Sequence, residues 1–370
     1  MSETWPCAEC LGRTWLIARL AGSIEIARHQ RRRLREILAL TDEALLSAVG
    51  GERAPQLVAE LEELDGGALR QAVADAGLEA TCRHDEDYPT RLRQLDDLPA
   101  ALFVAGGVER LRALAGGDLE NGPRAVAVVG TRRASPDGLE VARVLGRGLA
   151  AAGVTVVSGM ALGIDSAAHA GALEAGGPTI AVLASGADLP YPPSKARLRC
   201  EIVEAGGCVV SELPPGFQPL KWCFPARNRI IAGLAHMTIV VEAAVRSGSL
   251  ITAEIATDLG REVGAVPGPV TAWRAAGTNA LLRDGAILIR DARDALDGAV
   301  GVQGGDHGPP LHLEPRLREL LGEVASGRDT LAALAAAPGE VGPTLAGLTE
   351  LELLGHLRRS AGGRYVVIPS

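Results

Sequence analysis

Three short loops combine glycine, hydroxyl side chains and arginine, which are residue types suited to binding phosphate. The first is "VGTRRAS" over residues 129–135, where two arginines follow a glycine that allows a tight backbone turn. The others are "SGMALGIDSAAH" over residues 158–169 and "RSGSLIT" over residues 246–252, both of which open helices whose first amides attract anions. The loops predict a phosphate site, which could serve a nucleotide cofactor, a small substrate or a nucleic-acid backbone.

A fourth segment brings aromatic rings next to cations. Trp222 and Phe224 stand beside Lys221 and Arg227, in a chain that is only 3% aromatic. Rings that stack on bases beside cations that contact phosphates favour sequence-tolerant binding of a single strand. Either ring taken alone is equally consistent with a place in the hydrophobic core.

Positive charge is predicted to be local. The net charge of −8 argues against a globally basic nucleic-acid binder. Acidic residues are absent from residues 189–200 and 213–241, and these two windows contain the only lysines, Lys195 and Lys221. Because binding depends on the electric field over one surface, we expect a basic patch there.

Several catalytic motifs are absent from the sequence. It contains no G-x-x-x-x-G-K-[ST] loop and no G-x-G-x-x-G after the first predicted strand, so we predict no nucleotide cofactor. Asp165, Ser166 and His169 could be imagined as a hydrolytic triad, but no G-x-S-x-G elbow presents a serine. We therefore expect Asp165 and Ser166 to act at the start of a helix.

The cysteines predict neither a metal site nor a disulfide framework. Cys7 and Cys10 form a lone C-x-x-C, with no second pair among the other four cysteines. This pattern favours unpaired thiols of a cytoplasmic protein over zinc or redox chemistry. The sequence has no charged-then-apolar leader and no apolar run of the roughly 20 residues that span a bilayer, so no membrane association is expected.

The elements that must position these loops follow from hydrophobic patterns. Residues 1–80 are predicted to form short helices, and Arg31, Arg32 and Arg33 among them a solvated face. Residues 81–298 alternate uniformly apolar β-branched runs with helical segments, which predicts a doubly wound, mostly parallel α/β sheet with ligands at the carboxyl ends of the strands. The predicted strands are 125–129, 154–157, 179–183, 208–210, 238–241, 263–266 and 286–289.

The C-terminal part is predicted to be a separate unit. Residues 299–312 are rich in Gly, Asp and Pro, as a linker is. Residues 313–370 show three helical patterns and then two short strands, which suggests a winged helix. Its candidate recognition helix carries Glu350 and Glu352 and no cation, so we expect a protein-contact or auxiliary role in place of major-groove reading.

Six ordered motifs resemble the DNA-processing protein DprA (Smf) family. They are "VGTRRAS", "SGMALGIDSAAHAGAL", "FPARNRIIAGL", "SGSLITAEIA", "AVPG" and "GTNALLRDGA". The resemblance implies an extended Rossmann-like domain with an N-terminal helical SAM-like domain and a C-terminal winged helix. It also implies a homodimer that binds single-stranded DNA without cleaving it. Such a protein loads RecA onto incoming strands, or onto strands coated with single-strand-binding protein, in natural transformation.

Carried over motif by motif, the resemblance implies a set of DNA-binding residues. The loop motifs supply backbone and hydroxyl contacts, and the remaining positions complete a basic and stacking surface. The set is Gly130, Thr131, Arg132, Ser158, Gly159, Met160, Ala161, Gly163, Lys195, Lys221, Phe224, Arg227, Asn228, Ser247, Gly248 and Ser249.

One alternative is an enzyme. "SGSLITAE" is faintly similar to the Gly-rich loop of Rossmann-type nucleotide phosphoribohydrolases, in which Glu254 would act at the ribose. The consecutive glycines of that loop are missing, and the acid-free aromatic window is larger than a mononucleotide needs. A winged-helix transcription regulator is disfavoured by the acidic recognition helix.

Overall fold

The computed structural model describes residues 5–30, 34–120 and 122–300, and then 313–326, 328–335, 338–354, 356–359 and 363–367. The chain divides into two compact units, residues 1–300 and 301–370. Arg31, Arg32 and Arg33 and most of the predicted linker lie outside the described residues.

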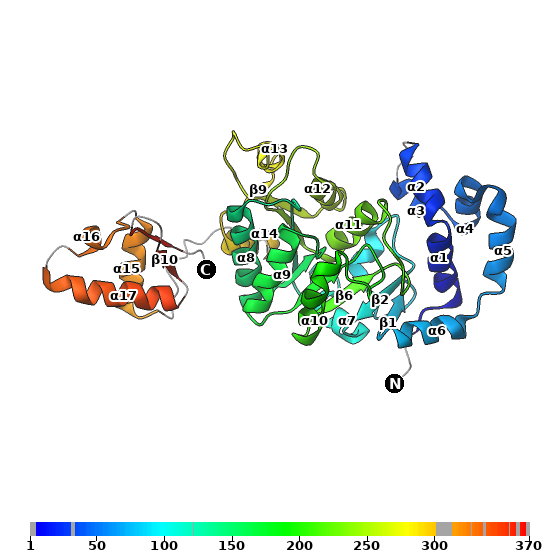
Figure 1. Ribbon diagram of the computed structural model, residues 1–370, viewed down its shortest axis with the longest axis horizontal. Coiled ribbons are helices and arrows are strands. Elements are labelled where there is room, and N and C mark those ends of the chain that lie inside the picture. The colour runs from blue at the N-terminus through cyan, green and yellow to red at the C-terminus, as the bar shows by residue number, and fades with distance from the viewer. Residues whose placement is uncertain are drawn as a thin grey trace. The chain divides into compact units, whose positions relative to one another are not determined.

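A nine-stranded, mostly parallel sheet forms the centre of the first unit (Figure 1). The strand order is β1-β2-β6-β5-β4-β3-β7-β8-β9, and only the pairs β1–β2 and β2–β6 are antiparallel. This confirms the predicted mixed α/β class with a mostly parallel sheet. The strands are β1 Glu79–Cys82, β2 Ala101–Ala105, β3 Ala125–Val129, β4 Thr155–Ser158, β5 Thr179–Val182, β6 Cys208–Ser211, β7 Met237–Val240, β8 Glu262–Ala265 and β9 Ile287–Leu288.

Helices cover both faces of this sheet, and for that reason its central strands β3 to β7 are buried at every position and mostly apolar. Alternate residues of β3 face opposite cores: Val126 and Val128 pack with one set of helices, and Ala125 and Ala127 with the other. The first set is α8 Pro136–Ala151, α9 Ile164–Glu174 and α14 Ala292–Val300. The second set is α7 Val108–Ala115, α11 Cys223–Leu234 and α12 Gly248–Asp258. Two further helices of this unit are α10 Ala196–Glu204 and α13 Ala276–Arg283.

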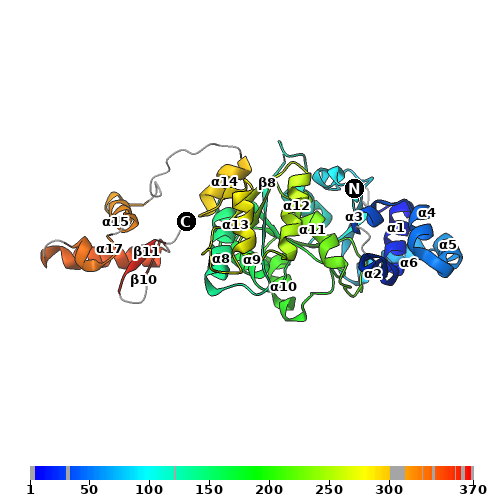
Figure 2. The ribbon, with the colours of Figure 1, turned by 90° about the horizontal axis from the view of Figure 1, so that it is seen from above.

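Short helices precede the sheet, as the sequence predicts (Figure 2). Their apolar residues share one core with the start of α11, where Trp222 is fully buried. A carboxylate oxygen of Glu25 accepts the Trp222 backbone N–H at 2.8 Å, which ties this region to α11. The helices are α1 Ala8–Arg19, α2 Ala21–His29, α3 Leu34–Ala39, α4 Asp42–Leu45, α5 Ala54–Glu62 and α6 Gly66–Asp75.

The strands β1 and β2 are not among the strands predicted from the sequence. They pair antiparallel, with Cys82 opposite Ala101, and extend the sheet beyond β6. Each is short, and β2, although apolar at every position, has a single β-branched residue, Val104, so it lacks the β-branched run that marks the predicted strands.

The second unit contains three α-helices and a two-stranded antiparallel sheet among its described residues. They are α15 Pro315–Ala325, α16 Leu331–Leu334, α17 Val341–Leu353, β10 Leu357–Arg359 and β11 Tyr365–Val367. Leu317, Leu321, Leu348 and Tyr365 contribute to its own hydrophobic core. Across the described part of both units, no helix combines the length and apolar character that a membrane span requires.

Candidate nucleic-acid interface

The strand order reverses at β3, and the main candidate cleft lies there. The chain runs from β3 through β4 and β5 to β6 on one side and then returns to β7 on the other side of β3. Open α/β sheets bind ligands at such switch points, at the carboxyl ends of the strands. A cleft of about 360 Å³ lies at this place. Its lining includes Gly130, Arg132, Ala161, Phe224, Arg227, Asn228, Ser247, Gly248 and Ser249.

The loop after β3 is held tightly against its neighbours. A Cβ atom on Gly130 would lie 2.6 Å from Ile164 Cγ1 and 3.0 Å from the Glu242 carbonyl oxygen, so this position has no room for a side chain. The Thr131 N–H donates to the same Glu242 oxygen at 2.8 Å. This fixed backbone places Arg132, whose side chain is exposed, at the mouth of the cleft.

An aromatic pair lies beside that arginine. The Arg132 Cζ atom lies 4.6 Å from the centroid of the Phe224 ring, and the Tyr191 ring centroid lies 5.5 Å from that of Phe224. Arg132, Tyr191 and Phe224 also line a second cavity of about 130 Å³. The two cavities share Arg132 and Phe224, so a cation and a ring lie between two adjacent hollows, and Tyr191 lines the smaller one.

The start of helix α12 forms another wall of the cleft. The Ser247 hydroxyl accepts the Ser249 N–H as the N-cap, and Gly248 is exposed. Asn228 Nδ2 donates to the Gly248 carbonyl oxygen at 3.1 Å, which joins α11 to this loop. An N-terminus of this kind presents backbone donors and a positive dipole to an anion.

Residues 158–163 mainly support the cleft from below. Ser158 is buried and its hydroxyl donates to the Val128 carbonyl oxygen at 2.7 Å. Met160 is fully buried with a φ of 54°, and Gly163 packs directly against the Thr131 carbonyl oxygen. Of this loop, only Ala161 lines both cavities, with Gly159 lining the smaller one.

The carboxylate of Asp165 accepts a hydrogen bond from the loop whose backbone amides the sequence predicts to bind phosphate. Asp165 Oδ2 accepts the Gly159 N–H at 3.1 Å, in the interior. Burial raises the pKa of Asp165, and the charge of nearby Arg227 opposes that shift. The Arg227 guanidinium is itself buried and donates to the Val182 carbonyl oxygen at 2.5 Å. Burial lowers the pKa of Arg227 to about 10, so it stays charged at neutral pH.

The predicted basic window lies mostly inside the protein. Arg229 and His236 are buried, and Arg229 makes a two-pronged ion pair with Glu212, with both contacts at 2.6 Å. Lys221 is exposed and Lys195 is partly exposed, but neither lines the two cavities. The acid-free stretch therefore reflects buried cations held by carboxylates and carbonyls from elsewhere in the chain.

No hydrolytic triad forms among Asp165, Ser166 and His169. The Ser166 hydroxyl donates to the Ala161 carbonyl oxygen at 2.5 Å, and His169 Nδ1 lies 2.7 Å from Thr179 Oγ1. Glu254, the candidate acid of the enzymatic alternative, is exposed on α12 and does not line the cleft.

Tyr191 and Arg28 are among the lining residues that the predicted set does not include. Tyr191 is 42% exposed and packs on Phe224. It lies inside the acid-free window at 189–200, which was the one available signal. Arg28 of α2 reaches the cleft from the N-terminal helices, where it pairs with Glu25 at 2.8 Å. Nothing in the local sequence pattern indicates that α2 packs there.

Comparisons with known proteins point to one family. Residues 79–299 match the family described as DNA recombination-mediator protein A. The chain is 38% identical to Protein Smf of Escherichia coli K12 over 293 residues, which cover 75% of this chain and 74% of that one. It is 43% identical to DNA processing protein DprA of Streptococcus pneumoniae over 212 residues, which cover 57% of this chain and 71% of that one.

Two solved structures are also similar. The X-ray structure of DprA from Streptococcus pneumoniae superposes with a TM-score of 0.61 at 34% identity, covering 80% of this chain and 97% of that chain. The DprA structure from Helicobacter pylori, described in terms of its single-stranded DNA binding mode, has a TM-score of 0.50 at 28% identity. That match covers 60% of this chain and 96% of the other.

Proposed function

This chain belongs to the DNA recombination-mediator protein A family, and we propose that it binds single-stranded DNA, without cleaving it, at the cleft between the ends of β3 and β7. The observation that carries the proposal is the group of Arg132, Phe224 and Tyr191, which combines a cation with two rings where the cleft meets the smaller cavity. Single strands offer phosphates and unstacked bases together, and this combination serves both.

In the proposed complex, each part of the cleft has a separate role. Bases stack on Phe224 and Tyr191, while the Arg132 guanidinium and the amides at the start of α12 contact phosphates. Gly130 and Thr131 hold the loop after β3 against its neighbours, and Lys221 and Lys195 extend the path of positive charge beyond the cavities. Because this recognition uses ring faces and phosphates, it tolerates any base sequence.

The remaining residues of the set position these contacts. Arg227 and Asp165 are buried at the cleft and interact electrostatically, and Asn228 fixes the loop that holds Ser247, Gly248 and Ser249. Ser158, Gly159, Met160 and Gly163 brace the backbone beneath Ala161. A strand bound here is held between pre-formed loops.

We further propose that the bound strand is delivered to the RecA recombinase, and that the protein acts as a homodimer on strands that carry single-strand-binding protein. Residues 1–80 would then be a helical SAM-like domain, and residues 313–370 a winged helix in an auxiliary, protein-contacting role. Helix α17 carries Glu350 and Glu352 and no cation, which favours a protein partner over DNA for that helix.

Two experiments test the proposal. Fluorescence anisotropy with a labelled oligo-dT strand should show salt-sensitive binding that Arg132→Ala or Lys221→Ala weakens several-fold. Unchanged affinity in both variants would rule out this site. Filament formation by RecA on strands coated with single-strand-binding protein should accelerate when the protein is added, and equal rates with and without it would refute the delivery step.

Incubation with AMP separates the enzymatic alternative. Release of free adenine would support a phosphoribohydrolase, and we expect none. The exposed position of Glu254, outside the cleft, is the physical reason for that expectation.

A further inference from the structure

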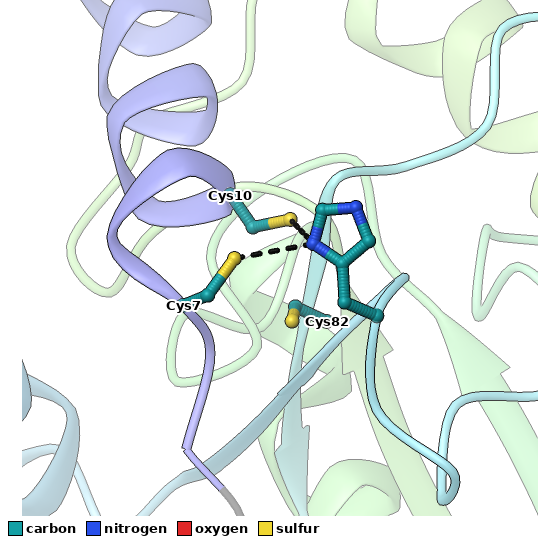
Figure 3. Close-up of side chains that lie close together, drawn as sticks. Cys7, Cys10 and Cys82 are labelled. Carbon is teal, nitrogen blue, oxygen red and sulfur yellow. Dashed lines mark hydrogen bonds between the residues drawn. The ribbon is translucent and has the colours of Figure 1, made fainter.

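Three cysteines and a histidine come together far from the DNA cleft. Cys7 and Cys10 belong to the start of α1, and Cys82 is the last residue of β1 (Figure 3). With His84, their sulfur and nitrogen atoms all lie within 4.8 Å of one another. The sequence pattern predicts that Cys7 and Cys10 are unpaired thiols, because nothing in the spacing links them to residues more than seventy positions later.

We propose that Cys7, Cys10, Cys82 and His84 bind one structural zinc ion. Three thiolates and an imidazole are a ligand set that closed structural zinc sites use. With four protein ligands, no coordination position stays open for water or substrate, so the ion has a structural role. This proposal is independent of the DNA-binding function.

The interatomic distances suit a tetrahedral ion. Cys7 Sγ lies 3.2 Å and Cys10 Sγ 3.6 Å from His84 Nδ1. Zinc bonds of about 2.3 Å to sulfur and about 2.0 Å to nitrogen place neighbouring ligands about 3.6–3.8 Å apart in a tetrahedron. Small side-chain rotations therefore bring all four atoms to coordination distance.

The backbone holds the two ligand pairs in place. Cys7 is the N-cap of α1, and its carbonyl oxygen accepts the Leu11 N–H at 3.1 Å, so Cys10 follows one turn later on the same side. After β1, the Asp85 carboxylate accepts the Cys82 N–H at 2.8 Å and the Thr81 hydroxyl at 3.1 Å. This turn brings residue 84 back over the strand end.

The surroundings suit a negatively charged zinc centre. Three thiolates, one neutral imidazole and Zn²⁺ carry a net charge of −1, and the Arg83 guanidinium interacts with the Cys10 sulfur. Arg83 also bridges to Glu9 of α1 at 2.7 Å. The positive end of α1 further favours thiolates at its first turn. Cys10 and Cys82 are buried against Ala100 and Ala101, which limits solvent access to the sulfurs.

The ion would connect two parts of the chain that are distant in sequence. Cys10 and His84 are 74 positions apart, and the intervening residues form the N-terminal helices and β1. Cross-linking such a long segment reduces the conformational freedom of the unfolded chain. Zinc therefore stabilises the attachment of α1 to the edge of the sheet.

Metal analysis of the full chain, purified in reductant without chelator, tests the proposal. We expect one zinc ion per chain by plasma mass spectrometry. The double variant Cys7→Ser/Cys10→Ser should lose it, whereas Cys200→Ser, which removes an exposed cysteine outside the group, should keep it. Equal zinc in the double variant, or a Cys7–Cys10 disulfide in the reduced preparation, would overturn the proposal.

Cobalt substitution tests the ligand set without relying on the double variant to fold. The metal-free wild-type chain loaded with Co²⁺ should show the strong visible absorption of tetrahedral cobalt and the charge-transfer band of thiolate ligands. His84→Ala should weaken metal binding about tenfold or more, and His84→Cys should restore it as a four-cysteine site. A weak octahedral spectrum, or an iron–sulfur chromophore in the protein as purified, would refute a Cys3His zinc site.

Removing zinc with a chelator tests whether the ion has a structural role. Removing zinc should lower the melting temperature and speed hydrogen exchange in α1 and β1 of the wild-type chain, with no further effect on the double variant. Unchanged exchange in α1 and β1 after zinc removal would contradict the attachment role.

Discussion

The Arg132 guanidinium lies over the face of the Phe224 ring, 4.6 Å from its centroid. One residue follows β3 and the other stands in the first turn of α11, so the sheet and a covering helix meet at this contact. A cation on an exposed ring contributes about 0.5–1 kcal/mol. Its main effect here is geometric, because it holds the charge beside the ring at the mouth of the cleft.

Replacing Arg132 should weaken DNA binding through lost charge. We expect Arg132→Ala to reduce affinity for oligo-dT several-fold and to lower the slope of log K against log salt by about one. Arg133→Ala is the matched control, because Arg133 is an exposed neighbour that does not line the cleft. Anisotropy titrations over a range of salt concentrations measure both quantities, and equal effects of the two substitutions would contradict the assignment.

Replacing the rings should weaken binding through lost stacking. Phe224→Leu and Tyr191→Leu keep an apolar side chain but remove the ring, and each should cost about 1–3 kcal/mol of binding free energy. The loss should disappear on an abasic strand, which offers phosphates without bases. Trp273→Leu removes an exposed ring outside the cleft and serves as control. A loss of equal size on the abasic strand would argue against stacking.

Replacing Arg229 should lower the free energy of unfolding. This prediction concerns stability and does not involve DNA binding. The Arg229 guanidinium is 2% exposed and pairs with both Glu212 and Asp97, so Arg229→Met leaves two buried carboxylates without their cation. Breaking such a pair costs about 3–5 kcal/mol of unfolding free energy. Urea denaturation measures it. Arg246→Met, at an exposed position, should change stability little, and equal values for the two variants would contradict the role of the network.

A methyl group at Gly171 should push apart α8 and α9, which cover one face of the sheet. A Cβ there would overlap the Arg143 carbonyl oxygen, because α8 and α9 cross with their backbones in contact. Gly171→Ala should therefore lower stability by roughly 1–3 kcal/mol or more through overpacking. Gly22→Ala, in a helix with open space around the site, should be neutral or stabilising. Thermal unfolding of both variants separates the contact from the helix propensity.

The buried imidazole of His169 should make stability depend on pH. Burial, then the charges of Arg227 and Lys195, lowers the pKa of His169 from 6.5 to about 3. Between these values the unfolded chain binds a proton that the folded protein does not. Stability therefore falls as pH drops below about 6.5, with a slope of up to about 1.4 kcal/mol per pH unit.

Urea denaturation from pH 4 to 7 measures that slope. His169→Asn should have a flatter profile than the wild-type chain, because the substituted side chain takes up no proton on unfolding. Parallel profiles for the two proteins would show that the pKa of His169 is the same in the folded and the unfolded chain.

The sequence alone determined the strands of the parallel region and the order of the site loops. Uniformly apolar β-branched runs predicted the strands of the parallel region, since strands covered on both faces need apolar side chains throughout. The loop at residues 129–135 was placed correctly at a strand end, because local composition marks where a strand stops. The three helical patterns predicted within residues 313–370 are also present, as α15, α16 and α17.

Only the tertiary structure decided which of the singled-out side chains reach the cleft. Arg227 and Arg229 look like surface cations in the sequence, yet both are buried because carbonyl oxygens and carboxylates from other elements surround them. Tyr191 packs on Phe224, and Cys82 lies close to Cys7, because elements that are distant in sequence meet in the fold. Local patterns report how a segment is built, but contacts between segments depend on how their buried faces pack together, and no single segment encodes that packing.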